Sequence, residues 1–148
     1  MARTYRFTPL RRLVNLLVFP LIRLGISDRR LHLLTVRGRD GRPYTVPVTL
    51  IEHEGRRWLV APYGEVLWVR RARAAGEVTL SRARRSRTVP LEQASPEEAA
   101  RVLREYLRQV PVVRPYFDVT SASSLEEIAA EAPRHPVFRI PSSGSEGP

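Results

Sequence analysis

Three strand-like runs joined by two tight turns constrain the fold of this chain more than any other feature. The runs are Leu31–Arg37, Pro43–Ile51 and Arg56–Ala61. Asp40-Gly41 separates the first two runs, and this pair favours a hairpin because Gly adopts positive φ at no steric cost and Asp can bond to its own backbone. His53-Glu54-Gly55 separates the second run from the third. The segment therefore predicts a three-stranded β-meander.

The rest of the chain predicts three more strands and four helices. Two short alternating runs flank Ala83-Arg84-Arg85 and indicate a second hairpin. Ser95-Pro96-Glu97-Glu98 has the pattern of a capping box with proline at the first helical position. The expected strands are Glu77–Arg82, Arg87–Glu92 and Pro136–Ile140; the expected helices are 8–24, Glu65–Ala75, Pro96–Gln109 and one from Ser123 or Ser124 to Ala132, with a proline-broken crossing segment at Pro111–Phe117.

Short strands with Gly and Pro turns, and helices that fill the ends, are typical of a small closed or split barrel. The expected fold class is α+β, mainly β: a split β-barrel of about six antiparallel strands. A doubly wound parallel sheet is excluded, because that fold alternates strand with helix. Pro47 cannot donate to a strand ladder and is expected at an edge or a bulge. The residues expected to face the core are Val46, Val48, Leu50, Leu59, Val78 and Leu80.

Composition excludes several kinds of chemistry. The chain has 148 residues and no Cys, so disulfides, thiol catalysis and Cys-ligated metal are excluded. All 25 basic residues are Arg, which excludes a Schiff-base lysine and a P-loop lysine. His32, His53 and His135 have no metal-ligand spacing, so no metal site is expected. The acidic pairs stand at helix starts, where the helix dipole explains them. An enzymatic function would therefore depend on a cofactor.

The net charge of +10 is unevenly distributed. Residues 1–30 carry +6 and residues 37–87 carry +7, whereas residues 88–148 carry −3. Such a distribution implies an anionic partner: a phosphorylated cofactor, a membrane surface or a nucleic acid. A solvated arginine-rich face is the alternative. No stacked aromatic pattern accompanies the arginines, as single-strand platforms need, so nucleic acid is not the expected partner.

The expected N-terminal helix, residues 8–24, has a wide apolar face and basic ends. Its apolar run, Leu13–Ile22, is too short to span a bilayer, and no small-residue cleavage site follows it. The helix is expected either to pack across the mouth of the barrel or to rest on an anionic membrane. A cytoplasmic location is expected, with peripheral membrane contact through residues 8–24 as the open question.

Arginines and aromatic residues gather at two places that could hold a cofactor. Arg37, Arg39 and Arg42 surround the first turn, and Arg70 and Arg71 open a short helix after a Gly loop. Guanidinium groups bind phosphate in a bidentate manner, so two or three of these could hold an anionic tail. Trp68 and Tyr63 flank a Gly-containing loop, where they could pack on a planar ring or fill the barrel.

These segments, in this order and spacing, resemble the deazaflavin (F420)-dependent nitroreductase family. The resemblance covers roughly residues 30 to 140. It is carried by Gly38-Arg39-Asp40-Gly41-Arg42-Pro43, Pro47, Trp58-Leu59-Val60-Ala61-Pro62-Tyr63-Gly64 and Trp68-Val69-Arg70-Arg71-Ala72-Arg73-Ala74-Ala75-Gly76. It implies an FMN-binding-like split barrel in which the turn and the loop before the Trp helix hold the tail and ring of a deazaflavin coenzyme. Asp40 stands alone between Arg39 and Gly41 where the family has two residues, and Arg71 replaces its usual Asn.

The resemblance implies an oxidoreductase that transfers a hydride from reduced coenzyme F420 to a quinone, nitroaromatic or enone. Pro62 takes the place of the usual loop Ser, so the proton would come from Tyr63, Tyr116 or water. The residues expected at the cofactor are Gly38, Arg39, Gly41, Arg42, Pro47, Ala61, Pro62, Tyr63, Gly64, Trp68 and Arg71.

Two alternatives stay open at the level of sequence. One is a barrel that binds flavin mononucleotide (FMN) or another small ligand, and the other is a non-enzymatic basic module on membrane or nucleic acid. The expected organisation is a helical arm (1–30), a cofactor-binding barrel (31–140) and a disordered tail (141–148), as a monomer or homodimer.

Overall fold

The computed structural model of the protein describes residues 30–141. The expected helix 8–24 and nearly all of the expected tail lie outside the described residues. Within the described range the chain forms two compact units. The hairpin unit comprises residues 30–50 and 67–91, and the helical unit comprises residues 51–66 and 92–141.

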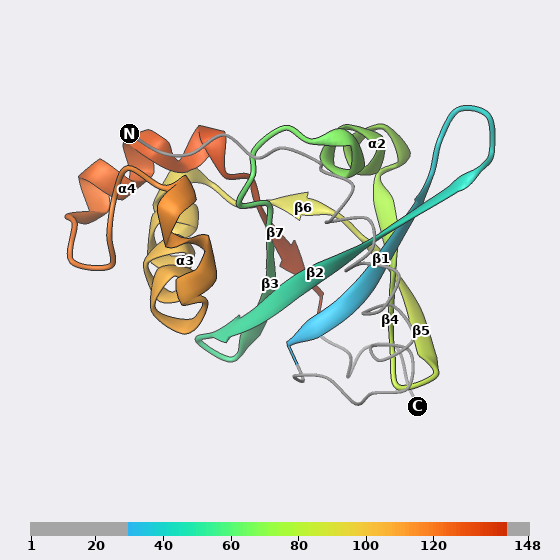
Figure 1. The fold of residues 1–148 in the computed structure, drawn as a ribbon, viewed down its shortest axis with the longest axis horizontal. Helices are drawn as coiled ribbons and strands as arrows, with labels where there is room; N and C mark the ends of the chain where they lie inside the picture. Colours follow the sequence, from blue (N-terminus) through green and yellow to red (C-terminus); the bar gives the residue numbers. More distant parts are fainter. Residues whose placement is uncertain (1–29, 142–148) are drawn as a thin grey trace. The chain divides into compact units, whose positions relative to one another are not determined.

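Four strands and one helix build the hairpin unit (Figure 1). They are β1 (Leu31–Arg37), the first part of β2 (Pro43–His53), α2 (Leu67–Ala75), β4 (Glu77–Arg82) and β5 (Arg85–Pro90). The strand order is β5-β4-β1-β2, and Leu34 of β1 stands opposite Val46 on one side and Leu80 on the other. Helix α2 packs on β1 and β4 with Trp68, Val69 and Ala72 buried. It begins two residues later than expected, because the Val66 N–H is already bonded to the Gly64 carbonyl in a turn.

The first hairpin closes through a three-residue turn. The Gly38 N–H donates to the Arg42 carbonyl oxygen (3.0 Å), and the Gly41 N–H donates to the Gly38 carbonyl oxygen (2.9 Å). Gly41 has φ of 78°. A type I turn followed by a left-handed Gly is a frequent three-residue hairpin loop. Asp40 Oδ1 accepts from the Arg42 N–H (3.0 Å), so the expected roles of Asp40 and Gly41 in the turn are confirmed.

Pro47 causes no bulge in the ladder between β2 and β1, and its expected position at an edge stays a prediction. The register from Leu31–Thr49 to Arg37–Pro43 is unbroken, and Pro47 stands opposite Leu33. Since Leu50 donates its N–H to Arg30, the bonded pairs with β1 alternate in a way that leaves Leu33–Pro47 a non-hydrogen-bonded pair. The missing N–H of Pro47 therefore costs no bond to β1.

The turn of the second hairpin is one residue shorter than the sequence indicates, since Arg82 already pairs with Arg85. Strand β5 begins at Arg85, not Arg87, and Ser81 stands opposite Ser86. Ala83 and Arg84 both have positive φ, 51° and 64°. Two left-handed central residues make a turn whose twist matches that of the strands, although Gly or Asn usually occupies these places. Because neither Gly nor Asn stands at these two positions, the sequence pattern placed the start of β5 at Arg87 and not at Arg85.

The helical unit combines short strands with most of the helices (Figure 1). Its elements are the end of β2, β3 (Arg56–Val60), β6 (Glu92–Gln93), α3 (Pro96–Gln109), the 3₁₀ helix η1 (Pro111–Tyr116), α4 (Leu125–Glu131), the 3₁₀ helix η2 (Ala132–Arg134) and β7 (Val137–Ile140). The strand order is β2-β3-β7-β6, with Trp58 opposite Arg139. Its core gathers Ile51, Trp58, Leu103, Tyr106, Leu107, Ile128 and Val137.

Strand β2 runs through both units, so the seven strands form one sheet in the order β5-β4-β1-β2-β3-β7-β6. β1 pairs with β2 and β4, β3 with β7, β4 with β5, and β6 with β7, all in the antiparallel sense. The seventh strand, β6, was not expected, because two polar residues carry no alternation. Of the residues expected in the core, Val48, Leu50, Leu59, Val78 and Leu80 are buried. Val46 is only half-buried, since burial along β2 decreases toward the exposed first turn.

Both capping boxes hold their carboxylates in the charged form. Ser95 Oγ accepts from the Glu98 N–H, and Glu98 accepts from the Ser95 N–H. That backbone bond, followed by nearby Arg139, lowers the pKa of Glu98. The bond from the Ser124 N–H lowers the pKa of Glu127 in the same way.

Replacing Glu98 by Ala should lower the free energy of unfolding at neutral pH more than replacing Glu97 by Ala. Glu97 shares the first turn of α3 but lies outside the box. Because the folded-state pKa of Glu98 is lowered, its contribution is present above the ordinary value of 4.5 and is lost as the pH falls through the lowered value. Urea unfolding of both variants over this range measures the effect. A difference that does not shrink in acid contradicts it.

Candidate functional site

A basic cleft lies in the hairpin unit, between the first turn and helix α2. Its volume is about 630 Å³. We call it the arginine cleft; its lining residues are Arg37, Gly38, Arg39, Asp40, Leu67, Arg70, Arg71, Ala74 and Ala75. Four guanidinium groups thus stand against one carboxylate, which suits the binding of an anion.

Helical spacing places one side of α2 in this cleft. Leu67, Arg70, Arg71 and Ala74 follow one another at i, i+3, i+4 and i+7, so they share one face. The buried residues Trp68, Val69 and Ala72 occupy the face that packs on the sheet. Arg70 and Arg71, the two arginines expected at the start of this helix, therefore both line the cleft.

Arg71 lies tightly against the first turn. A Cβ atom on Gly38 would come within 3.2 Å of Arg71 Cζ and 3.1 Å of Asp40 Oδ1. Arg71 Cζ also lies 5.2 Å from the centre of the Tyr44 ring, within cation–π range. The missing side chain of Gly38 thus makes room for a guanidinium group that the Tyr44 ring helps to hold.

The other arginines of the turn differ in their roles. Arg37 Nη1 donates to the Gly41 carbonyl oxygen (2.9 Å) and so supports the turn as well as lining the cleft. Arg42 lies 3.8 Å from Asp40, its side chain is 87% exposed, and it is not among the lining residues. Gly41 shapes the turn without lining the cleft, and Pro47 lies within β2.

The charge of the described residues follows the two units. The hairpin unit carries eleven arginines against Asp40 and Glu77, whereas the helical unit carries eight arginines against eleven acidic residues. The sequence had placed the positive charge in the N-terminal arm and the meander. Among the described residues it is concentrated in the unit that contains the arginine cleft.

The loop 61–64 lies in the helical unit, where the chain from Arg134 to Pro136 fixes it. The Ala61 N–H donates to the Pro136 carbonyl oxygen (2.8 Å), and His135 Nδ1 lies 2.8 Å from the Pro62 carbonyl oxygen. Gly64 has φ of 86°, and a Cβ there would come within 3.2 Å of the Arg134 carbonyl oxygen. Both the backbone angle and the space therefore require Gly at position 64.

The two proposed proton donors, Tyr63 and Tyr116, lie together in the helical unit. Their ring centres are 4.8 Å apart and their planes meet at 75°, an edge-to-face contact. Tyr106 lies nearby in the core, and burial, followed by the charge of Tyr63, raises its pKa above the ordinary value. Tyr106 therefore stays a neutral phenol at physiological pH.

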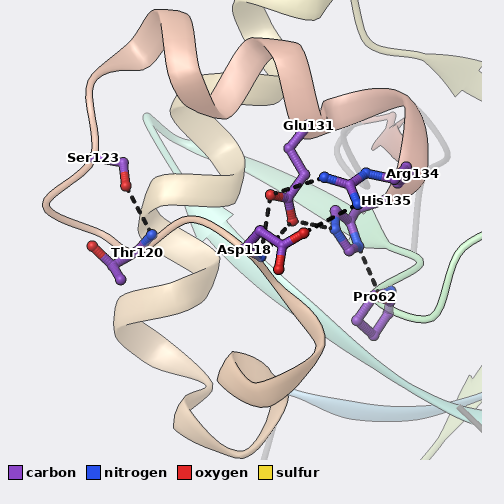
Figure 2. Close-up of polar contacts among 7 residues, drawn as sticks. All are labelled: Pro62, Asp118, Thr120, Ser123, Glu131, Arg134 and His135. Carbon is purple, nitrogen blue, oxygen red and sulfur yellow. Dashed lines mark hydrogen bonds and ion pairs between the residues drawn. The ribbon is translucent and has the colours of Figure 1, made fainter. Parts of the chain in front are cut away.

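A buried polar cluster, which the sequence analysis missed, lies next to this loop (Figure 2). His135 Nε2 lies 2.7 Å from Glu131 Oε2. Glu131 also accepts from the Asp118 N–H through both oxygens (3.1 and 3.0 Å) and pairs with Arg134 (3.3 Å). The four-residue spacing of Glu131 and His135 was the available signal, since residues at i and i+4 meet on a helix.

The structure thus brings the expected residues together in two separate sets. Gly38, Arg39 and Arg71 meet at the arginine cleft. Ala61, Pro62, Tyr63 and Gly64 form one loop, and Tyr63 contacts Tyr116. Trp68 is buried, at 7% exposure, so its ring packs in the hairpin unit and offers no open face to a ligand.

In the part of the chain that the structure describes, no group of three or more His, Asp or Glu residues could hold a metal ion. Residues 30–141 also contain no helix with the length and apolar character needed to cross a membrane.

Alanine substitutions at Gly38, which is crowded, and at Gly41, which is not, form a matched pair that tests the role of Arg71. Gly38→Ala should displace Arg71 and weaken the binding of inorganic pyrophosphate about tenfold, as expected for one charged hydrogen bond. Gly41→Ala should leave pyrophosphate binding intact and lower the free energy of unfolding by about 1 kcal/mol, because only its positive φ is strained. Calorimetric titration and thermal unfolding measure the two effects. Equal loss of pyrophosphate binding in both variants contradicts the assignment of Arg71.

Comparisons with known proteins were made at three levels. No protein-family model matches the chain, and no curated protein matches it. Among solved structures, an F420-H2 dependent reductase (FDR-A) has a TM-score of 0.55 and 21% identity, covering 78% of this chain and 96% of its own. A NimC/NimA family protein from Clostridium acetobutylicum has a TM-score of 0.52 and 16% identity, covering 88% of this chain and 80% of its own. A protein described as a domain-swapped dimer has a TM-score of 0.57 and 17% identity, covering 89% and 96%.

Likeness at these identities is a likeness of fold. The antiparallel strand order and these neighbours together confirm the expected fold class, and the chain is a split β-barrel that shares its fold with the F420-H2 dependent reductase and the NimC/NimA family protein.

Proposed function

We propose that the protein is an oxidoreductase that binds the deazaflavin coenzyme F420 and reduces an electrophilic acceptor such as a quinone, nitroaromatic or enone. The observation that carries the proposal is the arginine cleft. It includes Gly38 and Arg39 of the turn, which the resemblance to the nitroreductase family puts at the coenzyme, and Arg71, which is also expected there. The fold shared with an F420-H2 dependent reductase supports the same assignment.

The residues of the cleft fit an anionic tail. Arg37, Arg39, Arg70 and Arg71 supply guanidinium forks, which bind phosphate and carboxylate in a bidentate manner. Gly38 lets Arg71 approach the turn closely, and among residues 30–141 Asp40 is the only carboxylate in the lining. Arg39 and Arg71 would hold the tail, while Arg37 supports the turn carbonyl.

When bound, the reduced coenzyme supplies a hydride to the acceptor. The chain itself would contribute binding, the exclusion of water and a proton. Pro62 has no side-chain donor, so we assign the proton to the Tyr63–Tyr116 pair, whose phenols meet edge to face. A neutral phenol can donate a proton, and general-acid catalysis typically contributes 10²- to 10⁴-fold to a rate.

The competing candidate is a basic module without enzymatic activity, which the eleven arginines of the hairpin unit favour. An FMN-binding barrel is the competing cofactor assignment. The basic module and the FMN-binding barrel each differ from the proposal in their expected ligand affinity. The difference lies in how that affinity depends on the length of the ligand's anionic tail and on individual arginines.

Binding of F420 should be tighter than binding of FMN at low salt, and the difference should shrink as salt is added. Exposed charges are screened beyond about 8 Å at physiological ionic strength, so added salt weakens the attraction for the longer acidic tail of F420 more than that for FMN. Arg39→Ala and Arg71→Ala should each weaken F420 binding by about 1–3 kcal/mol. Arg85→Ala removes the same charge from the same unit outside the cleft and serves as the control. Fluorescence titrations of both cofactors at several salt concentrations measure these affinities.

The opposite outcome would favour the basic module. It would consist of no F420 binding at any salt concentration, together with DNA affinity that falls equally for Arg39→Ala, Arg71→Ala and Arg85→Ala.

Replacing the proton donor by Phe should lower kcat by about 10²-fold with little change in cofactor affinity, because Phe keeps the ring contact and loses the hydroxyl. Tyr63→Phe and Tyr116→Phe, measured singly, identify the donor. If both variants keep the kcat of the parent protein, the proton comes from water and the tyrosine assignment is wrong.

A further inference from the structure

His135 lies between the two chain segments that carry the tyrosine pair. Its ring stacks on Phe117, with centres 3.8 Å apart and planes 19° apart, and Phe117 directly follows Tyr116. Its Nδ1 bonds to the carbonyl oxygen of Pro62, which directly precedes Tyr63. A single buried imidazole, only 5% exposed, thus contacts the neighbours of both tyrosines.

Both ring nitrogens of His135 face acceptors (Figure 2). The Pro62 carbonyl oxygen accepts only, at 2.8 Å from Nδ1, and the Glu131 carboxylate lies 2.7 Å from Nε2. Glu131 receives the Asp118 N–H on both oxygens and lies 3.3 Å from the Arg134 guanidinium. Both oxygens of the Glu131 carboxylate therefore act as acceptors. A neutral imidazole has one N–H, so only the imidazolium form donates at both positions.

We infer that His135 is a positioning residue for the Tyr63–Tyr116 pair, and that its protonated form holds the pair in place. The catalytic part of this inference rests on the proposed role of the tyrosines. The neutral form can satisfy only one of its two acceptors. Either the Pro62 carbonyl loses its donor and the loop loosens, or the Glu131 carboxylate faces a lone pair.

The charges around His135 come from three elements. Glu131 lies at the end of α4, Arg134 in η2, and Asp118 just after η1, where its carboxylate pairs with Arg134 at 3.2 Å. Glu131 contacts the His135 ring directly. Arg134 and Asp118 contact Glu131 and so affect the ring only through that carboxylate. Converting Glu131 to Gln therefore removes the group that stabilises the imidazolium and leaves a neutral acceptor in its place.

The first experiment needs no cofactor. The ring nitrogens of the three histidines can be followed by ¹⁵N–¹H NMR across a pH titration, beside the tyrosine signal in near-ultraviolet circular dichroism. We expect the tyrosine signal to stay constant while both nitrogens of His135 carry protons, and to change in the pH range where the ring loses one. A tyrosine signal that does not change as the His135 ring loses a proton overturns the inference.

Variants separate positioning from mere stability. His135→Phe keeps the stack on Phe117 and removes both donors, so the tyrosine signal should be lost. Glu131→Gln should move the pH at which the signal changes, while Glu126→Gln, an exposed carboxylate on the same helix, should not. Should His135→Phe fail to fold, Glu131→Gln and the titration of the parent protein still decide the matter. A pH response identical in Glu131→Gln and Glu126→Gln overturns the inference.

Turnover then tests the catalytic part. His135→Phe should reduce kcat about 100-fold, as misplacement by about 1 Å can do, while F420 affinity at the arginine cleft stays unchanged. Loss of the tyrosine signal without loss of kcat overturns the catalytic part of the inference. If F420 does not bind the parent protein at all, the proposed function fails, and the NMR and dichroism results still decide whether His135 holds the pair.

Discussion

The unbroken antiparallel register between β1 and β2 is the constraint on which the hairpin unit depends. β1 is bonded on both sides, to β2 and to β4, so a slip of one residue would turn every buried side chain to the wrong face. The register also fixes where the chain must turn. Gly38 and Arg42 form the last bonded pair, and the loop between them has room for only three residues. The arginines of the turn are placed by strand pairing, while those of α2 are placed by the apolar face that Trp68 and Val69 bury.

In the helical unit, the loop 61–64 is fixed without strand pairing along its length. Ala61 is bonded to Pro136, Pro62 to His135, and Gly64 lies against Arg134, so three consecutive C-terminal residues hold the loop. Burying the polar groups of His135 and Glu131 costs desolvation energy, and hydrogen bonds must offset that cost. The Asp118 N–H and Arg134 provide them. Such a pair is weak evidence for stability, but its directional bonds specify one loop conformation.

Much of this architecture follows from local sequence rules, and the parts that do not are instructive. Asp40-Gly41 and the capping box at Ser95 act within a few residues, so their signals survive in the sequence alone. The sequence did not predict the two-residue turn at Ala83 and Arg84, because these residue types rarely adopt positive φ and strand twist there outweighs residue preference. The place of Arg70 in the cleft could be predicted from helical spacing but not from the turn motif. Pairing between Glu131 and His135 was visible as a spacing, whereas their bonds to Asp118 and Pro62 join residues 13 and 73 positions apart, which no local pattern reveals.

The two candidate sets of residues also differ in the physics of their environment. The arginine cleft is lined by exposed or half-exposed guanidinium groups, whose attraction for an anion acts through solvent and weakens with salt. The tyrosine pair stands beside the buried His135–Glu131 contact and a stacked ring, where an unpaired polar group is costly. Arginine serves the first purpose because it keeps its charge at any physiological pH. Histidine serves the second because only its imidazolium form donates from both ring nitrogens, so the number of hydrogen bonds that hold the loop depends on its protonation. Affinity for an anion and the placement of a proton donor are therefore expected to respond to different variables, ionic strength for the first and pH for the second.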